Sequence, residues 1–377
     1  MFGKKFLLLA APIGLITFHA AFAVAPKSTF AAAAPSKKPA GIEHTAEVKR
    51  LISLAKENGE RELNVAWCQC SLGGAEGAKR LETLFNGLYG LNIRVTFTPA
   101  VSMTEMAGRI TQEVVAGQKA SSDLLLGSET HYGALLDRGV LEEYDYTRLS
   151  PRITADLVAP KNIAVQIAGS GIAGIAYNTS AISSAEIPKK LEDVLNPKWK
   201  GKIASSVNAA YLDRVAYRPE WGPEKMKVFV KKLSGHIGGL IVTGEMSRIV
   251  SGEFTMLVLG GHTQVLRDKA KGAPLDFIIP DDAAIVGFLH LGVPRNSVHS
   301  NLAKLFISMI TSEEGQRIIY EGEFTDHPLL PGSRSAALLK DLNARGIEPL
   351  KFGVKFVSEN PEIRQLGDQL RNILRQK

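Results

Sequence analysis

The 377-residue sequence contains only two cysteines, Cys68 and Cys70, so a fold held together by several disulfides is excluded. A bridge between cysteines separated by one residue would close a small, strained ring. Half a metal site is conceivable, but no nearby residues complete it. We therefore expect free or reversibly oxidised thiols near the end of a strand.

Two enzyme signatures are also missing. There is no G-x-S-x-G motif, which would place a nucleophilic serine on a sharp turn, and no H-E-x-x-H metal motif. Five histidines are scattered along the chain, and we expect them on the surface or in the core: His131, His236, His290, His299 and His327. An exported enzyme would need a nucleophile beside a base, or a complete set of metal ligands. Because the sequence indicates neither, we do not expect an enzyme.

Long apolar runs are absent beyond the N-terminus, where Lys4 and Lys5 precede the apolar stretch 6–18 and a small-x-small pattern ends at Ala23. This arrangement is typical of a secretory signal peptide, here residues 1–23. An uncleaved anchor is the alternative, although a proline and a glycine interrupt the span. No later stretch approaches the about 20 apolar residues of a bilayer span. We expect a soluble, exported protein with a flexible leader at 24–41.

The basic charge lies mostly outside the predicted fold. The whole chain has a net charge of +7, and five lysines but no acids precede residue 42, which leaves +2 for residues 42–377. No basic-aromatic patch accompanies them, so nucleic acid is not an expected partner. The 336 residues from 42 to 377 exceed what one core usually serves, so we expect two lobes.

Helical and strand patterns alternate through the first part of this region. The periodicity predicts helices near 45–57, 78–90, 103–114 and 130–138, and strands at 62–67, 92–99 and 123–127. Ser102 and Glu105 form a capping box before the third helix. We expect a βαβαβ half with a parallel sheet, whose strand-end loops at 68–74, 98–102 and 127–130 lie at one edge.

Two long extended runs, 162–180 and 284–294, bracket the middle of the chain. Between them we expect strands at 202–205, near 254–259 and at 275–280, and helices near 207–217, 223–234 and 243–251, and after them helices near 300–321 and 360–375. The chain would cross twice between lobes, with lobe 1 at 42–160 and 283–345, lobe 2 at 161–282, and a C-terminal helical segment at 346–377. A ligand cleft between the lobes follows.

The glycines of GSGIAG (169–174) match a dinucleotide fingerprint, but the following residues are typical of a strand, whereas the fingerprint opens a helix. A glycine-rich bend in an inter-lobe strand explains the motif better.

Polar residues follow several predicted strands. Gly260 and Gly261 allow close approach of the backbone, and His262 and Thr263 follow them. The other strand-end groups are Ser205 and Ser206, as an anion site or an ordinary helix cap, and Ser128, Glu129 and Thr130, as ligands or a helix start.

The stretch IAYNTSAISSAEIPKKLEDVLNPKWKGKIA (175–204) resembles the extracellular solute-binding proteins of ABC importers, in the ferric-iron-binding branch. DLLLGS, LLDRGVLEEY and ISMITSEEGQRII resemble further segments of that family. The resemblance implies a two-lobed type II periplasmic-binding-protein fold, with each α/β lobe built on a mostly parallel sheet, an inter-lobe cleft and a two-strand hinge. It also implies a non-enzymatic, monomeric protein, free in the periplasm and without a cofactor, that delivers a solute to a permease and ATPase complex.

The sequence departs from the branch at the positions of two iron-binding tyrosines, which are His262 and Thr263 here. The resemblance places the branch's histidine near Cys70 and Ser71 and its glutamate near Ser128 or Glu129. If a metal ion binds, its ligands are Glu129 and His262. Because the phenolates are missing, we expect an anionic or polar organic solute. Ferric iron or its chelate, and a ligand-presenting module for a membrane sensor, remain alternatives. The expected ligand residues are Cys70, Ser71, Gly73, Gly74, Ser128, Glu129, Ser205, Ser206, Gly261, His262, Thr263 and Asp281.

Overall fold

The structure is a computed structural model that describes residues 44–376 except 69–71, 73, 101 and 243–244. By their internal contacts, residues 42–377 form one compact unit and residues 1–41 form another. The predicted signal peptide and leader, and Cys70, Ser71 and Gly73 of the predicted site, lie outside the described residues.

The first part of the unit has the predicted alternation. Its elements are α1 (Ala46–Glu57), β1 (Glu62–Cys68), α2 (Gly74–Tyr89), β2 (Arg94–Ala100), α3 (Met103–Val115), β3 (Leu125–Ser128) and α4 (Glu129–Leu135). The hydroxyl of Ser102 accepts a hydrogen bond from the Glu105 N–H at 3.1 Å, which confirms the predicted cap. β1 and β2 pair in parallel, as predicted.

The predicted parallel half is only partly confirmed at the third strand. Leu124 forms an isolated parallel bridge with Val65 of β1, as predicted, whereas β3, which begins at the next residue, pairs antiparallel with β9 (Ile285–Gly292). A buried apolar run does not encode the direction of its partner, and the partner here stands far along the chain.

The two long extended runs form β4 (Val165–Asn178) and β9, which lie side by side and antiparallel. Val165 and Ile167 of β4 pack in one hydrophobic core, which we call the first core, with Leu63, Phe85 and Phe306. Further along β4, Ala173 and Ile175 pack in a second core, with Phe229 and Met256. The strand therefore passes from one core to the other, and the GSGIAG motif lies within it.

The remaining elements pack in these two cores and in smaller hydrophobic clusters beside them. The strands are β5 (Ile203–Ser206), β6 (Gly239–Ile241), β7 (Met256–Gly261), β8 (Leu275–Ile278) and β10 (Leu350–Phe352). The helices are α5 (Leu212–Val215), α6 (Pro223–Ser234), α7 (Ser247–Val250), α8 (His262–Ala270), α9 (Ser300–Ile310), α10 (Glu313–Glu323), α11 (Ala336–Ala344), α12 (Val354–Glu359) and α13 (Ile363–Arg375). Short 3-10 helices occupy Tyr146–Arg148, Ala155–Leu157, Pro160–Asn162, Ser184–Glu186, Leu191–Leu195 and Pro197–Trp199.

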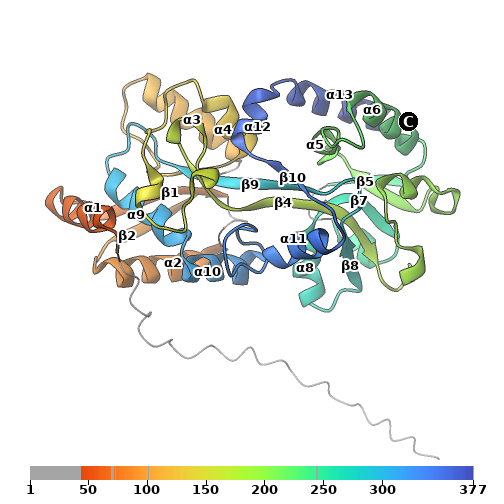
Figure 1. Cartoon of the computed structure of the whole chain (residues 1–377), viewed down its shortest axis with the longest axis horizontal. Coiled ribbons are helices and arrows are strands. Elements are labelled where there is room, and N and C mark those ends of the chain that lie inside the picture. Colours follow the sequence, from red (N-terminus) through yellow and green to blue (C-terminus); the bar gives the residue numbers. More distant parts are fainter. Residues whose placement is uncertain (1–43, 69–71, 73, 101, 243–244, 377) are drawn as a thin grey trace, which may run out of the picture. The chain divides into compact units, whose positions relative to one another are not determined.

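The larger sheet has the order β10-β9-β4-β7-β5-β6, with β3 beside β9 and β8 beside β4. β5 pairs in parallel with β6 and β7, whereas β4 pairs antiparallel with β7. In Figure 1 the strands of this sheet run across the middle, with α4, α12 and α13 on one side and α8, α10 and α11 on the other.

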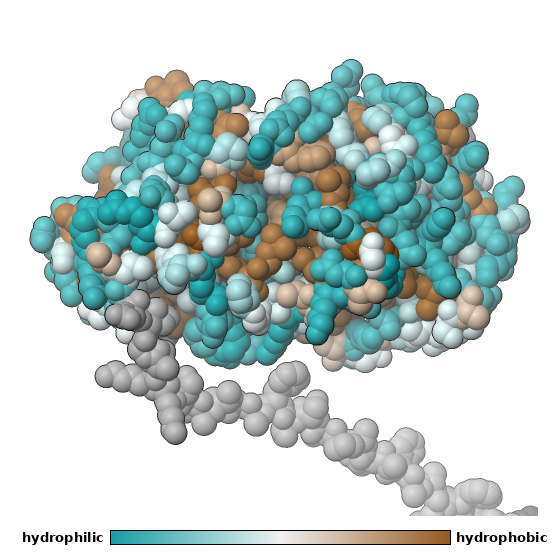
Figure 2. Space-filling model, in the orientation of Figure 1, coloured by the Kyte–Doolittle hydropathy of each residue, from teal (hydrophilic) through white to brown (hydrophobic). Residues whose placement is uncertain are grey.

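The C-terminal helix joins the second core, through Leu366, Leu370 and Leu374. The predicted lobe boundaries at 160, 282 and 345 stay predictions. The face in Figure 2 is largely hydrophilic, with apolar residues gathered towards its middle. Within the described residues, no helix combines the length and the apolar character that crossing a membrane requires.

Candidate functional site

Glu129 begins α4 directly after β3, and its side chain is fully buried. One carboxylate oxygen accepts a hydrogen bond from Arg214 Nη2 at 2.6 Å. The other accepts from the Phe288 N–H at 3.3 Å and from the Ser170 hydroxyl at 3.4 Å. The carboxylate is therefore compensated by donors of the protein itself.

The segment that carries Arg214 is held against two other strands. Tyr211, which precedes α5, has a left-handed backbone with φ +67°. A Cβ atom at Gly171 of β4 would lie 2.5 Å from the Tyr211 hydroxyl, and one at Gly261, at the end of β7, would lie 3.3 Å from it. These two glycines leave room for the Tyr211 side chain. Tyr211 therefore lies close to β4 and to the end of β7, while Arg214 of α5 binds Glu129 at the end of β3.

Left-handed non-glycine residues recur at the strand ends of this region. They are Leu72 after β1, Ala209 and Tyr211 after β5, and Leu259 within β7. Such conformations cost free energy and gather at functional sites in proteins.

His262 is the first residue of α8 and is only 1% exposed. Burial lowers the pKa of His262 to about 4, and the nearby Ile172 backbone partly offsets that effect. Neither ring nitrogen has a hydrogen-bond partner within the part of the chain that the structure describes. The imidazole is therefore neutral at pH 7, and it lacks direct access to solvent.

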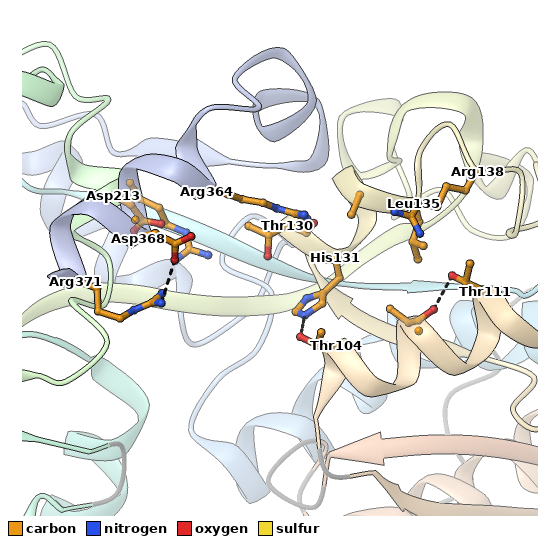
Figure 3. Close-up of a pocket in the computed structure, with 15 residues that line it drawn as sticks. Thr104, Thr111, Thr130, His131, Leu135, Arg138, Asp213, Arg364, Asp368 and Arg371 are labelled. Carbon is orange, nitrogen blue, oxygen red and sulfur yellow. Dashed lines mark hydrogen bonds and ion pairs between the residues drawn. The ribbon is translucent and has the colours of Figure 1, made fainter.

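A pocket of about 550 Å³ is lined by Arg214, the ion-pair partner of Glu129, while Glu129 itself stays buried behind it. Helices α3 and α4, whose apolar residues pack in the first core, form one wall, and α5 and α13, which pack on the second core, form the other. Figure 3 shows Thr104, His131 and Arg138 facing Asp213, Asp368 and Arg371 across it. The charged groups of the lining are Arg138, Arg214, Arg364, Arg371, Asp213 and Asp368.

Burial shifts the pKa values of His131 and Asp213, which both line the pocket. Burial lowers the pKa of His131, and the charges of Arg364 and Arg214 add to that effect. Its Nε2 lies 3.1 Å from the Thr104 hydroxyl, and its Nδ1 lies 2.8 Å from the Ser128 hydroxyl. Burial raises the pKa of Asp213, against the effect of Arg214. The four arginines of the lining outnumber its two aspartates, so the pocket is cationic.

The structure gives local roles to several predicted ligand residues. Ser128 caps α4 together with His131. Asp281 forms an ion pair with Arg345 at 2.8 Å. Gly74 begins α2 with φ +64°, and Thr263 lies in the first turn of α8.

The prediction of a helix start at Ser205 and Ser206 is wrong. Both residues lie within β5, where Ser205 is 1% exposed, and the next helix begins only at Leu212. The Ser206 hydroxyl accepts a hydrogen bond from the Asn208 N–H at 3.2 Å, in a turn. No free helical amides therefore stand directly after these hydroxyls.

The sequence analysis missed Tyr211 and Arg214, and also Arg364 and Arg371 of the C-terminal helix. Asp213 and Arg214 lie within the helix expected at 207–217, and adjacent opposite charges in a helix usually indicate a solvent-exposed face. Arg364 and Arg371 share one helical face, seven residues apart, but only the fold reveals what that face meets.

Comparison with known sequences identifies the class. Residues 121–347 match the family described as "bacterial extracellular solute-binding protein", and the chain belongs to this family. The Fe(3+)-binding periplasmic protein of Serratia marcescens is 27% identical over 197 residues, which are 48% of this chain and 58% of that protein. The major ferric iron-binding protein of Neisseria meningitidis serogroup B is 22% identical over 317 residues, 78% of this chain and 89% of that protein.

An uncharacterized protein of Haemophilus influenzae is 26% identical over 160 residues, 40% of this chain and 46% of that protein. The chain thus spans about half the length of this relative and of the Serratia protein.

Solved structures confirm the type II periplasmic-binding-protein fold. Iron-bound HitA from Pseudomonas aeruginosa has a TM-score of 0.65 at 21% identity, over 82% of this chain and 99% of that chain. FutA from Trichodesmium, in complex with iron and citrate, has 0.64 at 18%, over 83% and 99%. AfuA from Actinobacillus pleuropneumoniae, with fructose-6-phosphate bound, has 0.61 at 19%, over 83% and 99%. The fold is thus shared by proteins solved with different ligands.

Proposed function

We propose that this protein is the periplasmic solute-binding component of an ABC importer and that its solute is a small organic anion. Family membership supports the binding role, which includes delivery to a membrane permease. The observation that carries the choice of solute is the pairing of Glu129 with Arg214. The carboxylate that would hold a cation is compensated, and guanidinium groups line the adjacent pocket.

A bare ferric ion fits this arrangement poorly. Ferric iron favours anionic oxygen ligands, and Glu129 would have to leave Arg214 to supply one. His262 is buried, and the described residues contain no group of three or more histidine, cysteine, aspartate or glutamate side chains placed to hold a metal ion. An anion, in contrast, meets arginines, which bind carboxylates and phosphates through paired hydrogen bonds.

A ferric chelate is the second candidate, because two relatives are named as ferric-iron-binding proteins and FutA was solved with iron and citrate. A chelate such as ferric citrate presents carboxylates at its surface, so it is compatible with a cationic pocket.

Isothermal titration calorimetry tests the proposal. The purified exported chain is titrated with fructose-6-phosphate, methylphosphonate, citrate and ferric citrate, with putrescine as a cationic control. We expect binding of at least one anion and none of putrescine, with affinity that falls as salt rises. Binding of ferric citrate without binding of citrate supports the chelate. Binding of putrescine alone would contradict the anionic solute.

A further inference from the structure

The C-terminal helix α13 has two faces with different surroundings. One face is apolar and packs inward, with Ile363, Leu366, Leu370 and Leu374 buried. The other repeats at the spacing of one side of a helix and lines the pocket, with Arg364, Gly367, Asp368 and Arg371. The inward face accounts for the position of the helix, but it does not account for the arginines opposite.

The pocket-lining face of α13 contacts α4 across the pocket and lies close to α5 on its own side. Arg364 Nη2 donates a hydrogen bond to the carbonyl of Thr130 in α4 at 2.5 Å. A Cβ atom at Gly367 would lie 3.5 Å from the Asp213 carboxylate, so α13 approaches α5 closely at this point. Figure 3 shows Arg364 directed towards Thr130, and Arg371 joined to Asp368 by a hydrogen bond.

Two guanidinium groups in this pocket retain unused donors. Arg371 Nη1 donates to Asp368 at 3.0 Å, but its Nε is buried and has no hydrogen-bond partner among the described residues. Arg214 Nε is in the same state, although its Nη2 binds Glu129. Buried donors without acceptors are uncommon, because their lost hydration is not replaced. An anion in this pocket would give the two guanidinium groups an acceptor.

We infer that α13 forms one wall of the ligand pocket and that Arg371 and Arg364, together with Arg214 of α5, bind the oxyanion group of the solute. The group is a phosphoryl, phosphonate or carboxylate group, whose oxygens match the planar donor set of arginine. This inference rests on the proposed function and assigns its binding group. It places the C-terminal segment in the site, where its arginines select for anions.

Charge-removing variants on α13 test the inference in the intact chain. Arg371→Gln and Arg364→Gln are compared with Arg375→Gln, which removes the same charge from the same helix outside the pocket lining. Titrations use fructose-6-phosphate, methylphosphonate and citrate, which separates the three oxyanion groups. We expect each pocket variant to weaken the bound anion about tenfold or more, and Arg375→Gln to change it less than about twofold.

Asp368→Asn supplies a result that a merely structural role would not produce. Asp368 competes with an anion for Arg371, so its neutralisation should tighten binding by about threefold or more. Circular dichroism and melting temperature establish that each variant is folded. Because Asp368 is exposed, its replacement by asparagine should leave the protein folded. The affinity of this variant therefore tests the inference even if an arginine variant fails to fold.

Two failures are distinguishable. The first failure is that the wild-type protein binds an anion and that Arg371→Gln, Arg364→Gln and Asp368→Asn bind it equally well. In that case α13 is not part of the site and the proposed function stands. If the wild-type protein binds none of the three anions but binds another solute, the anionic solute is wrong and this inference falls with it.

Discussion

The Glu129–Arg214 pair places a fully buried carboxylate against an arginine side chain that is 20% exposed. Removing one member of a buried pair leaves the other charge without compensation, which is more costly than losing a surface contact. Glu129→Gln keeps the size of the side chain and removes its charge. We expect it to lower the free energy of unfolding by about 3 kcal/mol.

Urea unfolding measures this effect, with Glu143→Gln as the control because Glu143 is exposed. The control should change the free energy of unfolding by less than about 0.5 kcal/mol. An equally small effect at Glu129 would mean that the pair adds nothing to stability and that the carboxylate is free to bind a ligand.

At single residues the sequence predicted positions better than partners. Glu129 was predicted at a strand end, and it lies there. Its partner Arg214 stands 85 positions later, and no local pattern connects the two. The same limit applies to Asp281, which was predicted as a ligand residue and pairs with Arg345. Long-range ion pairs depend on the fold, and spacing along the chain does not encode them.

Among the elements, the crossing strands β4 and β9 carry a pH-sensitive feature. His290 of β9 stands opposite Gln166 of β4, and His327 Nε2 lies 3.3 Å from the Gln166 side-chain oxygen. Burial lowers the pKa of His290 to about 3, and the charge of His327 adds to that effect. Burial also lowers the pKa of His327 to about 3.

These pKa values predict loss of stability in acid. Below pH about 6.5 the unfolded chain binds protons at these histidines while the folded chain does not, down to pH about 3. Stability therefore falls as pH falls through this window, by up to about 1.4 kcal/mol per pH unit for each histidine. Urea unfolding at pH 7, 6 and 5 measures the slope, and His290→Gln should reduce it. An unchanged slope would show that His290 is protonated in the folded state.

The elements themselves were largely predictable, because periodicity and capping are local. The two extended runs, the capped helix α3 and the strand β5 all formed where predicted. Strand direction was not predictable for β3, since its neighbour β9 lies more than 150 residues away. The expected helix at 207–217 shrank to Leu212–Val215, because Ala209 and Tyr211 adopt left-handed backbone conformations.

In the whole molecule, the two cores and the crossing strands place the cationic pocket between helices of both cores. An anion bound there contacts α3 or α4 on one side and α5 or α13 on the other. A ligand that touches both walls favours the state in which they are close together, because it binds that state more tightly. The fold class followed from the sequence, and the composition of this pocket followed only from the structure.

Native mass spectrometry of the protein, purified without unfolding from cells grown in rich medium, separates an anionic solute from iron in one experiment. We expect an added mass that corresponds to a small organic anion, lost on acid treatment or at high salt. An added mass of iron alone would rule out the anionic solute and would support Glu129 and His262 as metal ligands. Iron together with a carboxylate chelator would instead establish the ferric chelate as the solute.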